Sequence, residues 1–361
     1  MEPVVNARDE AFVREMLAYG IDHQASDLFI IPGAELSYKI GDALDRRGER
    51  LSPQDCQEII AGVYNLSKRE HRYLDGPRVD DDFSIAVGGI GRFRLNVYHQ
   101  RNSLAAVIRV IKFGLPTPEE YDIPGEVMRV ADLRQGLVLV TGPTGSGKST
   151  TLACIVDRIN NTRSGHIVTV ENPIEYVHNH RECLVSQREI ATDVDTYEQA
   201  LTSALREHPD TIMFGEMRTR SVIEVAMRAA ETGQLMLSSL HTLGAAASIT
   251  RIIDTFPAEQ QAQARTQLSQ VLEAIISQKL LVDVQGKRIP VFEIMYSNPA
   301  IRNLVRENKI HQIDSIIQAN ANIGMRTFDS DLIRLYQEGR LSKETVYAHC
   351  INDDAVRRQV R

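Results

Sequence analysis

The chain has 361 residues, of which 43% are hydrophobic and 25% are charged, and its formal net charge is −7. This length predicts about two domains, and the composition is that of an ordinary globular protein. The acidic balance excludes a chain-wide attraction to nucleic-acid phosphates, and no apolar run reaches the ~20 residues that span a bilayer.

The cysteines and the first residues indicate the cellular compartment. Cys56, Cys154, Cys183 and Cys350 lie far apart and form no C-x-x-C pair. This spacing indicates neither a zinc knuckle nor a disulfide framework, so we expect reduced thiols. The first ten residues, MEPVVNARDE, are polar and acidic and do not resemble a signal peptide. We therefore expect a cytoplasmic protein that meets a membrane only through a partner.

Residues 1–112 predict an α+β domain. Apolar residues at helical spacing predict helices at residues 8–20, 53–64 and 67–75. Apolar runs bounded by turn residues predict strands at residues 27–31, 36–40, 81–87, 92–100 and 103–113. The stretch LPTPEEYDIPG then brings three prolines and three acidic residues together, which is typical of a linker between domains. We assign the linker to residues 113–125.

Residues 126–361 predict a domain of a different class. Short apolar runs with little polar alternation, typical of strands buried on both faces, occur at residues 136–141, 166–171, 211–216 and 235–240. Helices are predicted between them at residues 148–160, 196–207 and 219–232. This alternation predicts a three-layer α/β domain with a parallel sheet. The tail from about residue 258 is predicted to be mostly helical.

The strongest signal is GPTGSGKST at residues 142–150, which matches G-x-x-x-x-G-K-[ST] between a predicted strand and a predicted helix. Glycines let several backbone N–H groups converge on one anion, and the helix amino terminus adds partial positive charge. Lys148 is predicted to reach the β- and γ-phosphates of ATP, and Ser149 to bind Mg²⁺. The predicted phosphate loop consists of Gly142, Pro143, Thr144, Gly145, Ser146, Gly147, Lys148, Ser149 and Thr150.

Three glutamates are predicted at the same edge of the sheet. Ligands bind at the carboxyl ends of parallel strands, and the next two predicted strands end near Glu171, Glu175 and Glu216. Hydrolysis needs a metal shell and a group that orients the attacking water. Glu216 ends an apolar strand, although Gly215 stands where an Asp is usual. Glu171 and Glu175 are the candidates for water activation, and each has a solvated surface charge as its alternative.

Four segments in a fixed order carry a family resemblance. GPTGSGKST, VENPIEYVH, LREHPDTIMFGEMR and AAETGQLMLSSLHT resemble the Walker A, Asp box, Walker B and His box of the type II/type IV secretion ATPase superfamily. Within it, HQASDLFI (23–30), SQREI (186–190) and AIRNLVRE (300–307) are similar to the twitching-motility ATPases that retract type IV pili. The resemblance runs from about residue 8 to about residue 340. The family's tetracysteine and long N-terminal extension, typical of assembly ATPases, are missing, which favours retraction.

The resemblance implies a fold and roles for individual residues. It implies a RecA-like ATPase domain that binds ATP and Mg²⁺, preceded by a PAS-like domain. Glu175 becomes the catalytic glutamate, Glu216 the Walker-B acid near Mg²⁺, and His241 the residue that senses the γ-phosphate. Two residues depart from the family pattern, because Asn172 replaces a common Asp and Gln234 replaces the first histidine of the His box. We expect activity to survive these departures.

Arginines of the N-terminal domain are further candidates. In RFRLNV, basic and apolar residues alternate, so one strand face is basic and the other apolar. A solvated sheet face is one interpretation. The family instead places such arginines on nucleotide phosphates, in the same subunit or from a neighbour, and the candidates here are Arg94, Arg109 and Arg101. The family also links the motif Ala300, Ile301, Arg302, Asn303 and Leu304 to retraction, although in an arbitrary protein such a segment is more often simple helix packing.

The resemblance further implies a homohexameric ring in which nucleotide binding closes the domains and hydrolysis reopens them. Such a ring would act on an inner-membrane platform protein of the pilus machinery, from the cytoplasmic side. Other readings stay open: a secretion or conjugation motor, or an accessory retraction ATPase, of the same superfamily. A nucleic-acid-translocating P-loop hexamer would show salt-dependent stimulation by DNA or RNA, and a small-molecule kinase would phosphorylate an organic acceptor. No nucleic-acid partner is expected.

Overall fold

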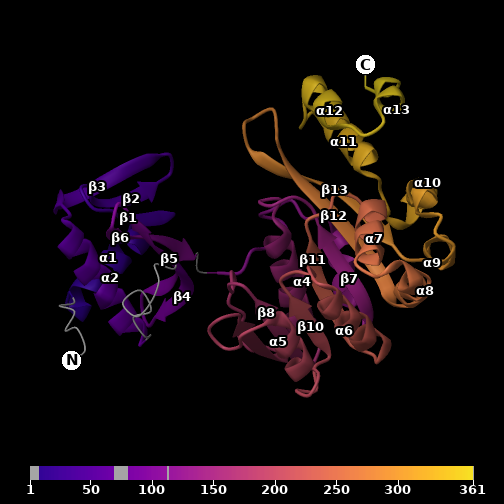
Figure 1. The fold of residues 1–361 in the computed structure, drawn as a ribbon. Coiled ribbons are helices and arrows are strands. Elements are labelled where there is room, and N and C mark those ends of the chain that lie inside the picture. Colours follow the sequence, from indigo (N-terminus) through magenta and orange to yellow (C-terminus); the bar gives the residue numbers. More distant parts are fainter. Residues whose placement is uncertain (1–7, 69–79, 112–113, 361) are drawn as a thin grey trace. The chain divides into compact units, whose positions relative to one another are not determined.

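The computed structural model describes residues 8–68, 80–111 and 114–360, and these form two compact units (Figure 1). The first unit comprises the described residues up to Gly114 together with Pro173–Val177, the second comprises Leu115–Asn172 and the residues from His178 onward, and each has its own sheet. This confirms the predicted fold class, in which an α/β domain with parallel strands follows a smaller N-terminal α+β domain.

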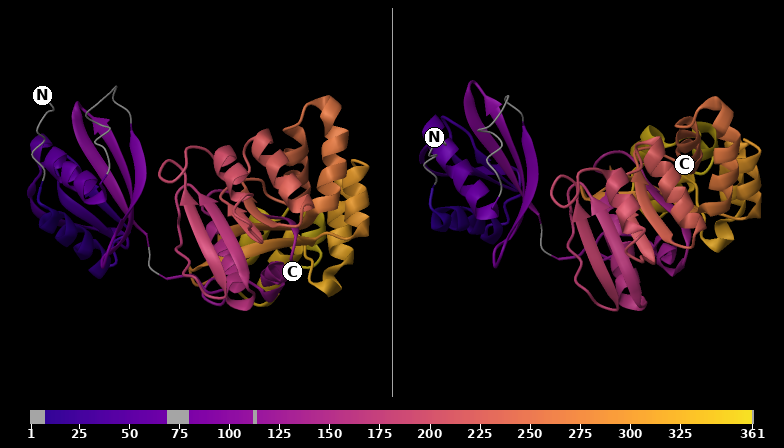
Figure 2. Two further views of the ribbon diagram at one scale, coloured as in Figure 1. Left: turned by 90° about the horizontal axis from the view of Figure 1, so that it is seen from below. Right: turned by 60° about the horizontal axis from the view of Figure 1, so that its bottom comes forward.

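The first unit is an antiparallel sheet that helices cover on one face (Figure 2). Its strands follow the order β3-β2-β1-β6-β5-β4. Its elements are α1 (Glu10–Asp22), β1 (Asp27–Ile30), β2 (Glu35–Ile40), β3 (Ala43–Arg50), α2 (Pro53–Ser67), β4 (Asp81–Val87), β5 (Gly91–Gln100) and β6 (Ser103–Ile111). Along β5, Phe93, Leu95 and Val97 are buried against α1 and α2, which confirms the predicted alternation.

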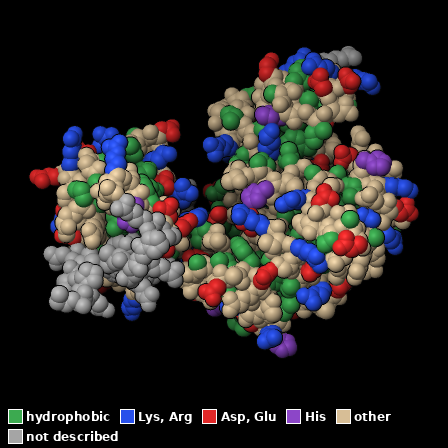
Figure 3. Space-filling model, viewed as in Figure 1, with side chains coloured by type: hydrophobic (Ala, Val, Ile, Leu, Met, Phe, Trp, Pro, Cys, Tyr) green, Lys and Arg blue, Asp and Glu red, His purple; other side chains and the backbone are tan. Residues whose placement is uncertain are grey.

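The strand β3 is not predicted by the sequence. It lies at the edge of the sheet, and almost all of its side chains are exposed, so it has no buried face to produce an apolar alternation. Basic side chains gather over β3, which contributes Arg46, Arg47 and Arg50 (Figure 3). Charged side chains on an edge strand discourage further strand pairing.

The predicted helix at residues 53–64 is α2, and it begins with a reciprocal cap. The Asp55 N–H donates to Ser52 Oγ (3.1 Å), and the Ser52 N–H donates to the Asp55 carboxylate (2.9 Å). The chain leaves the helix at Lys68 with a φ of 55°. The helix predicted at residues 67–75 lies almost entirely outside the described residues.

The second unit contains a seven-stranded sheet in the order β13-β12-β7-β11-β10-β8-β9, in which only β13 is antiparallel to its neighbour. Its strands are β7 (Gly136–Thr141), β8 (Gly165–Glu171), β9 (Cys183–Glu189), β10 (Thr211–Phe214), β11 (Leu235–Leu240), β12 (Leu272–Val282) and β13 (Arg288–Tyr296). Its first helices are α3 (Gly125–Met128), α4 (Lys148–Thr162), α5 (Tyr197–Ala204), α6 (Arg220–Glu231), α7 (Ala245–Asp254) and α8 (Gln261–Val271).

Helices cover both faces of this sheet, as predicted for three layers (Figures 1 and 2). Leu137 and Leu139 of β7 pack in a cluster with α5 to α8 on one face. Val138 and Val140 pack with α3 and α4 on the other face. Because β7 is buried on both faces, it reads as a continuous apolar run rather than an alternating one.

The prediction of a mostly helical tail is wrong for residues 272–296, which form β12 and β13. These strands extend the sheet beside β7. β12 is buried along most of its length, but Glu273, Ser277, Gln278 and Lys279 interrupt its apolar run, so it shows neither the continuous run of β7 nor an alternation. The remaining helices follow, α9 (Pro299–Arg306), α10 (Ile313–Ala319), α11 (Phe328–Gln337), α12 (Lys343–His349) and α13 (Asp353–Arg357).

Most of the predicted linker, residues 115–125, belongs to the second unit. The second unit therefore begins at Leu115 and not at residue 126. Ile123 is buried there, and the Asp122 carboxylate pairs with the Arg340 guanidinium at 2.7 Å. The Cys154 thiol donates to the Pro116 carbonyl at 3.3 Å. Pro116 and Asp122, two of the residues that predicted an interdomain linker, thus hold this stretch on its own unit, whereas residue 113 lies outside the described residues.

Candidate active site

The parallel strands of the second unit deliver the predicted site residues to one edge. β7, β11, β10 and β8 are neighbours in that order, and all run in the same direction. The phosphate loop follows β7, His241 follows β11, Glu216 follows β10, and Glu171 ends β8. The structure therefore brings the phosphate loop, His241, Glu216 and Glu171 to one end of the sheet, whereas Glu175 belongs to the segment Pro173–Val177, which groups with the first unit.

The phosphate loop is a tight turn that leads directly into α4. Gly147 has a φ of 88° immediately before Lys148, the first residue of that helix. The Lys148 ammonium donates to the carbonyls of Gly142 (2.9 Å) and Pro143 (3.0 Å), which hold it within the curve of the loop. Ser149 is exposed at the start of α4, where its hydroxyl is open to a ligand.

A chain of polar contacts links the phosphate loop to Glu216. The Thr144 hydroxyl lies 3.5 Å from His241 Nδ1, and His241 Nε2 lies 3.0 Å from Glu216 Oε2. The same Glu216 oxygen lies 2.6 Å from Arg218 Nε. A carboxylate only accepts, so a neutral His241 carries its proton on Nε2 and can accept from Thr144 through Nδ1. His241 therefore contacts both the phosphate loop, through Thr144, and the Glu216 carboxylate.

The two glutamates of the Asp box have different surroundings. The Glu171 side chain is buried, and its Oε1 accepts from the Thr169 hydroxyl (2.7 Å) and from Gln187 Nε2 (3.2 Å). Glu175 is exposed on the loop that leaves the carboxyl end of β8. The contacts of Glu171 suit a carboxylate that fixes β8 to β9, and they leave Glu175 as the better candidate for water activation.

Asn172 lines a cavity of about 380 Å³ together with Glu216 and Arg218. The same cavity is lined by Asp195 and Glu198, so an Asp at position 172 would add a further negative charge beside Glu216. Tyr197 also lines it, and burial, aided by the nearby Glu216 and Glu171, raises the pKa of Tyr197 so that its phenol stays neutral. With Asn172 in place of Asp, the cavity beside Glu216 therefore carries less negative charge.

Gln234, which replaces the first histidine of the His box, lies at the amino ends of the parallel strands, opposite the end that carries the phosphate loop. Gln234 precedes β11, and its carbonyl accepts from the N–H of Gly136, which begins β7. A six-residue strand separates it from His241, and such a strand is roughly 20 Å long. A change at position 234 therefore does not alter the phosphate-binding edge directly.

Of the three arginines predicted in the first unit, two are neighbours on adjacent strands and the third lies in a turn. Arg94 and Arg109 are cross-strand neighbours on β5 and β6, where Arg94 pairs with Asp82 (2.9 Å) and Arg109 with Asp27 (3.0 Å). Two like charges in this arrangement repel each other, and the aspartates offset that repulsion. Arg101 lies in the β5–β6 turn with a φ of 46°, away from the pair.

Some side chains of the motif at residues 300–304 are buried in the core, and others are exposed to solvent. Ile301 and Leu304 are buried in the core on α9. Arg302 donates to the Gln270 carbonyl and to Glu273, both at 2.6 Å. Asn303 is exposed, as is Ala300. Arg302 therefore anchors α9 to the start of β12, and Asn303 is the polar member that faces solvent.

Sequence reasoning missed the residues that support the site from β12 and β13. Ser277 Oγ accepts from the Gly244 N–H (2.8 Å), and Glu293 Oε1 accepts from the Ala245 N–H (2.6 Å), so this cross-strand pair holds the start of α7 just after His241. Gln278 contacts the phosphate loop itself. These residues belong to no sequence motif, and they lie on β12 and β13, which the sequence analysis did not predict.

Burial raises the pKa of Glu293 from 4.5 to about 7. Between these values the folded protein holds a proton that the unfolded chain releases, so this group lowers the free energy of unfolding as pH rises. We expect Glu293→Gln to gain stability relative to the wild type from pH 4.5 to pH 7, by at most about 3 kcal/mol. Urea unfolding at several pH values measures the free energy of unfolding, and Glu259→Gln, at an exposed position, is the control. If that free energy changed with pH in the same way for the wild type and both variants, the expectation would be contradicted.

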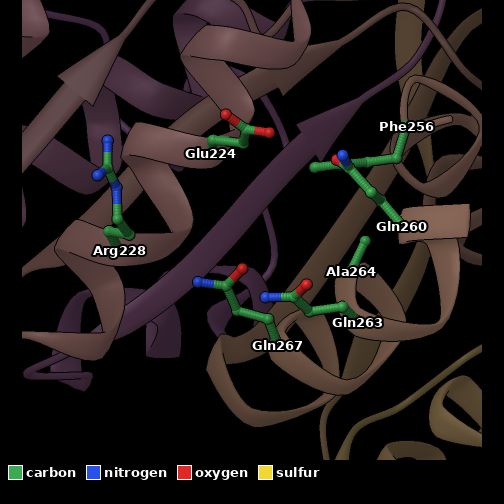
Figure 4. Close-up of a pocket in the computed structure, with 7 residues that line it drawn as sticks. All are labelled: Glu224, Arg228, Phe256, Gln260, Gln263, Ala264 and Gln267. Atoms are coloured by element: carbon green, nitrogen blue, oxygen red, sulfur yellow. The ribbon is translucent and has the colours of Figure 1, made fainter.

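A separate hollow of about 260 Å³ lies between α6 and α8 (Figure 4). Its walls include the amides of Gln260, Gln263 and Gln267, which face Glu224 and Arg228. None of the predicted site residues lines it. This hollow is therefore separate from the residues that the sequence assigns to nucleotide binding.

Comparisons with known proteins place the chain in a family. The family model described as "Type II/IV secretion system protein" matches residues 9–289. The type IV pilus retraction ATPase PilT of Pseudomonas aeruginosa is 43% identical over 332 residues, which cover 92% of this chain and 96% of that protein. The type IV pilus ATPase PilU of the same organism is 36% identical over 349 residues, which cover 96% of this chain and 91% of that protein.

A solved structure is similar over nearly the same extent. The crystal structure of the pilus retraction motor PilT with bound ADP has a TM-score of 0.88 and 40% sequence identity, covering 96% of this chain and 98% of that chain. The matched residues 9–289 include the phosphate loop, both Asp-box glutamates, Glu216 and His241. This chain therefore belongs to the type II/IV secretion system protein family.

Proposed function

We propose that this protein is an ATPase motor that retracts type IV pili and so supports twitching motility. The observation that carries the proposal is the contact chain from the phosphate loop through His241 to Glu216, in a protein 43% identical to PilT. Ser146 gives further support, because its hydroxyl oxygen is buried in the loop without a hydrogen-bond partner among the described residues. A phosphate oxygen is an acceptor that suits such a hydroxyl.

The residues divide the work of ATP hydrolysis as follows. Lys148 and the backbone N–H groups of the loop bind the β- and γ-phosphates, and His241 senses the γ-phosphate through its links to Thr144 and Glu216. Glu175 takes the proton of the attacking water. Mg²⁺ would be held by Ser149 and Glu216 and would neutralise phosphate charge. Magnesium at such sites takes only one or two protein ligands.

The motor itself is a homohexamer in this proposal. Arg94 and Arg109 lie side by side, and we propose that they contact nucleotide phosphates at closure, with Arg101 as a lesser candidate. Hydrolysis and release would reopen the domains and move an inner-membrane platform protein from its cytoplasmic face. Among the described residues, none of the helices has the length and apolar character needed to cross a membrane.

The direct test is phosphate release from MgATP by the purified full-length chain. We expect turnover that EDTA abolishes and that DNA, RNA and small organic acceptors leave unchanged. Turnover that rises steeply with DNA at low salt would instead indicate a nucleic-acid translocase. Phosphate transferred to an organic acceptor would indicate a kinase, and a protein that releases no phosphate would refute the ATPase.

An accessory retraction ATPase is a second candidate within the same family. It stays open because the chain is also 36% identical, over 96% of its length, to a second type IV pilus ATPase, PilU. The two candidates differ in genetics, because an accessory motor alone would not retract pili in a strain that lacks the main motor. Expression of this protein as the sole motor in such a strain separates them.

Asn303 offers the cleaner test of the motif at residues 300–304. We expect Asn303→Ala to leave ATPase activity within about twofold, because an exposed side chain contributes little to the fold, and to stop pilus retraction. Arg302→Ala should also lower stability by roughly 1 kcal/mol, because it loses its bonds to Gln270 and Glu273. Retraction in a complemented strain is the readout, and Gln318→Ala on the next helix is the control. Unaffected retraction with Asn303→Ala would remove the role assigned to this residue.

A further inference from the structure

Gln278 lies where β12 passes the start of the phosphate loop. Its neighbour Ser277 pairs with Thr141, the last residue of β7, so Gln278 is level with the first loop residue. Only 2% of its surface is exposed. A polar amide buried at this depth must have partners on both its donor and its acceptor side.

Both ends of the Gln278 amide contact the phosphate loop and the helix after it. Nε2 donates to the Ser146 carbonyl, and Oε1 accepts from the Thr151 hydroxyl at 2.7 Å. These partners flank Lys148 in the sequence, one on each side. The amide therefore fixes the two ends of the short segment that carries the lysine.

The same strand explains two of the loop glycines. A Cβ at Gly142 would collide with the Gln278 carbonyl oxygen, and a Cβ at Gly147 would lie 3.1 Å from Gln278 Nε2. Both glycines also have positive φ values, 143° and 88°. The loop is thus curved against Gln278, and the glycines are the residues that allow this close approach.

We propose that Gln278 is a positioning residue for nucleotide binding, which holds the backbone around Lys148 in the shape that receives phosphate. The inference rests on the proposed ATPase function. Its alternative is a purely structural role, in which loss of the amide would destabilise the unit without changing the affinity for nucleotide. The two roles separate because positioning appears in ADP affinity and in the KM for MgATP, measured on folded protein.

The test measures the Kd of fluorescent ADP, the KM for MgATP, kcat, and the unfolding midpoint without nucleotide. We expect Gln278→Leu to raise Kd and KM by about tenfold, the effect of losing hydrogen bonds to a buried site, with a smaller change in kcat. Gln278→Glu, which removes the donor and adds a negative charge near phosphate, should raise them further. Lys279→Gln is the control, since Lys279 contacts His349 of α12.

Thr151 provides an independent arm if Gln278→Leu does not fold. Thr151→Ser keeps the hydroxyl donor and should retain the wild-type Kd, whereas Thr151→Val should raise it. Folded Gln278→Leu with wild-type Kd and KM would overturn the inference, as would equal Kd values for the two Thr151 variants. A wild type that binds no ADP would instead refute the proposed function, and the inference with it.

Discussion

Lys148→Ala is expected to reduce ATP hydrolysis to background, a loss of at least about 10²-fold, because the lysine supplies the fixed positive charge at the phosphates. In the structure its ammonium is held by the carbonyls of Gly142 and Pro143, inside the curve of the loop. Alanine leaves the loop backbone in place but removes that charge. Phosphate release from MgATP by the purified variant measures the effect.

The control for this variant is Lys343→Ala, which removes an exposed lysine of α12 and should leave turnover unchanged. Equal unfolding midpoints for the two variants would show that the loss comes from chemistry and not from folding. A folded Lys148→Ala protein with normal ATPase activity would mean that the phosphate loop does not form the active site.

Glu175→Gln is expected to bind ATP yet hydrolyse it poorly, with kcat lower by about 10²–10⁴-fold, because the amide cannot accept the proton of the attacking water. Glu171→Gln should keep most activity. The Glu171 carboxylate already accepts from Thr169 and Gln187, and an amide oxygen can replace part of that role. Single-turnover hydrolysis together with ATP binding separates the chemical step from affinity.

The comparison of these two variants tests the assignment of the base. If Glu171→Gln binds ATP without turnover while Glu175→Gln remains active, then Glu171 is the base and the assignment made here is wrong. The Asn172→Asp variant adds a matched probe, since position 172 lines the cavity beside Glu216. We expect it to change kcat far less than Glu175→Gln.

The sequence predicted which strand ends meet at one end of the sheet, because their positions follow from local patterns. Four apolar runs and the glycine-rich loop locate strand ends, and parallel strands place those ends together. The sequence already favoured Glu175 over Glu171, but it could not show how the surroundings of the two carboxylates differ. That distinction depends on burial and on Gln187, a partner on a strand that no apolar pattern revealed.

The missed features share a physical cause. In β12 the polar residues Glu273, Ser277, Gln278 and Lys279 interrupt the apolar run, and β3 is exposed along most of its length, so neither shows the pattern of a buried strand. The residues that support the site from β12 and β13, including Gln278 and Glu293, act through long-range contacts and belong to no motif. Their roles become visible only when the strands are assembled.

The most direct test of the proposed retraction motor is the number of surface pili on cells that lack this protein. We predict hyperpiliated cells that do not twitch, because assembly would continue without retraction. Wild-type protein should restore normal piliation and twitching, whereas Lys148→Ala should restore neither. Bald cells would contradict retraction and would indicate a motor for pilus assembly.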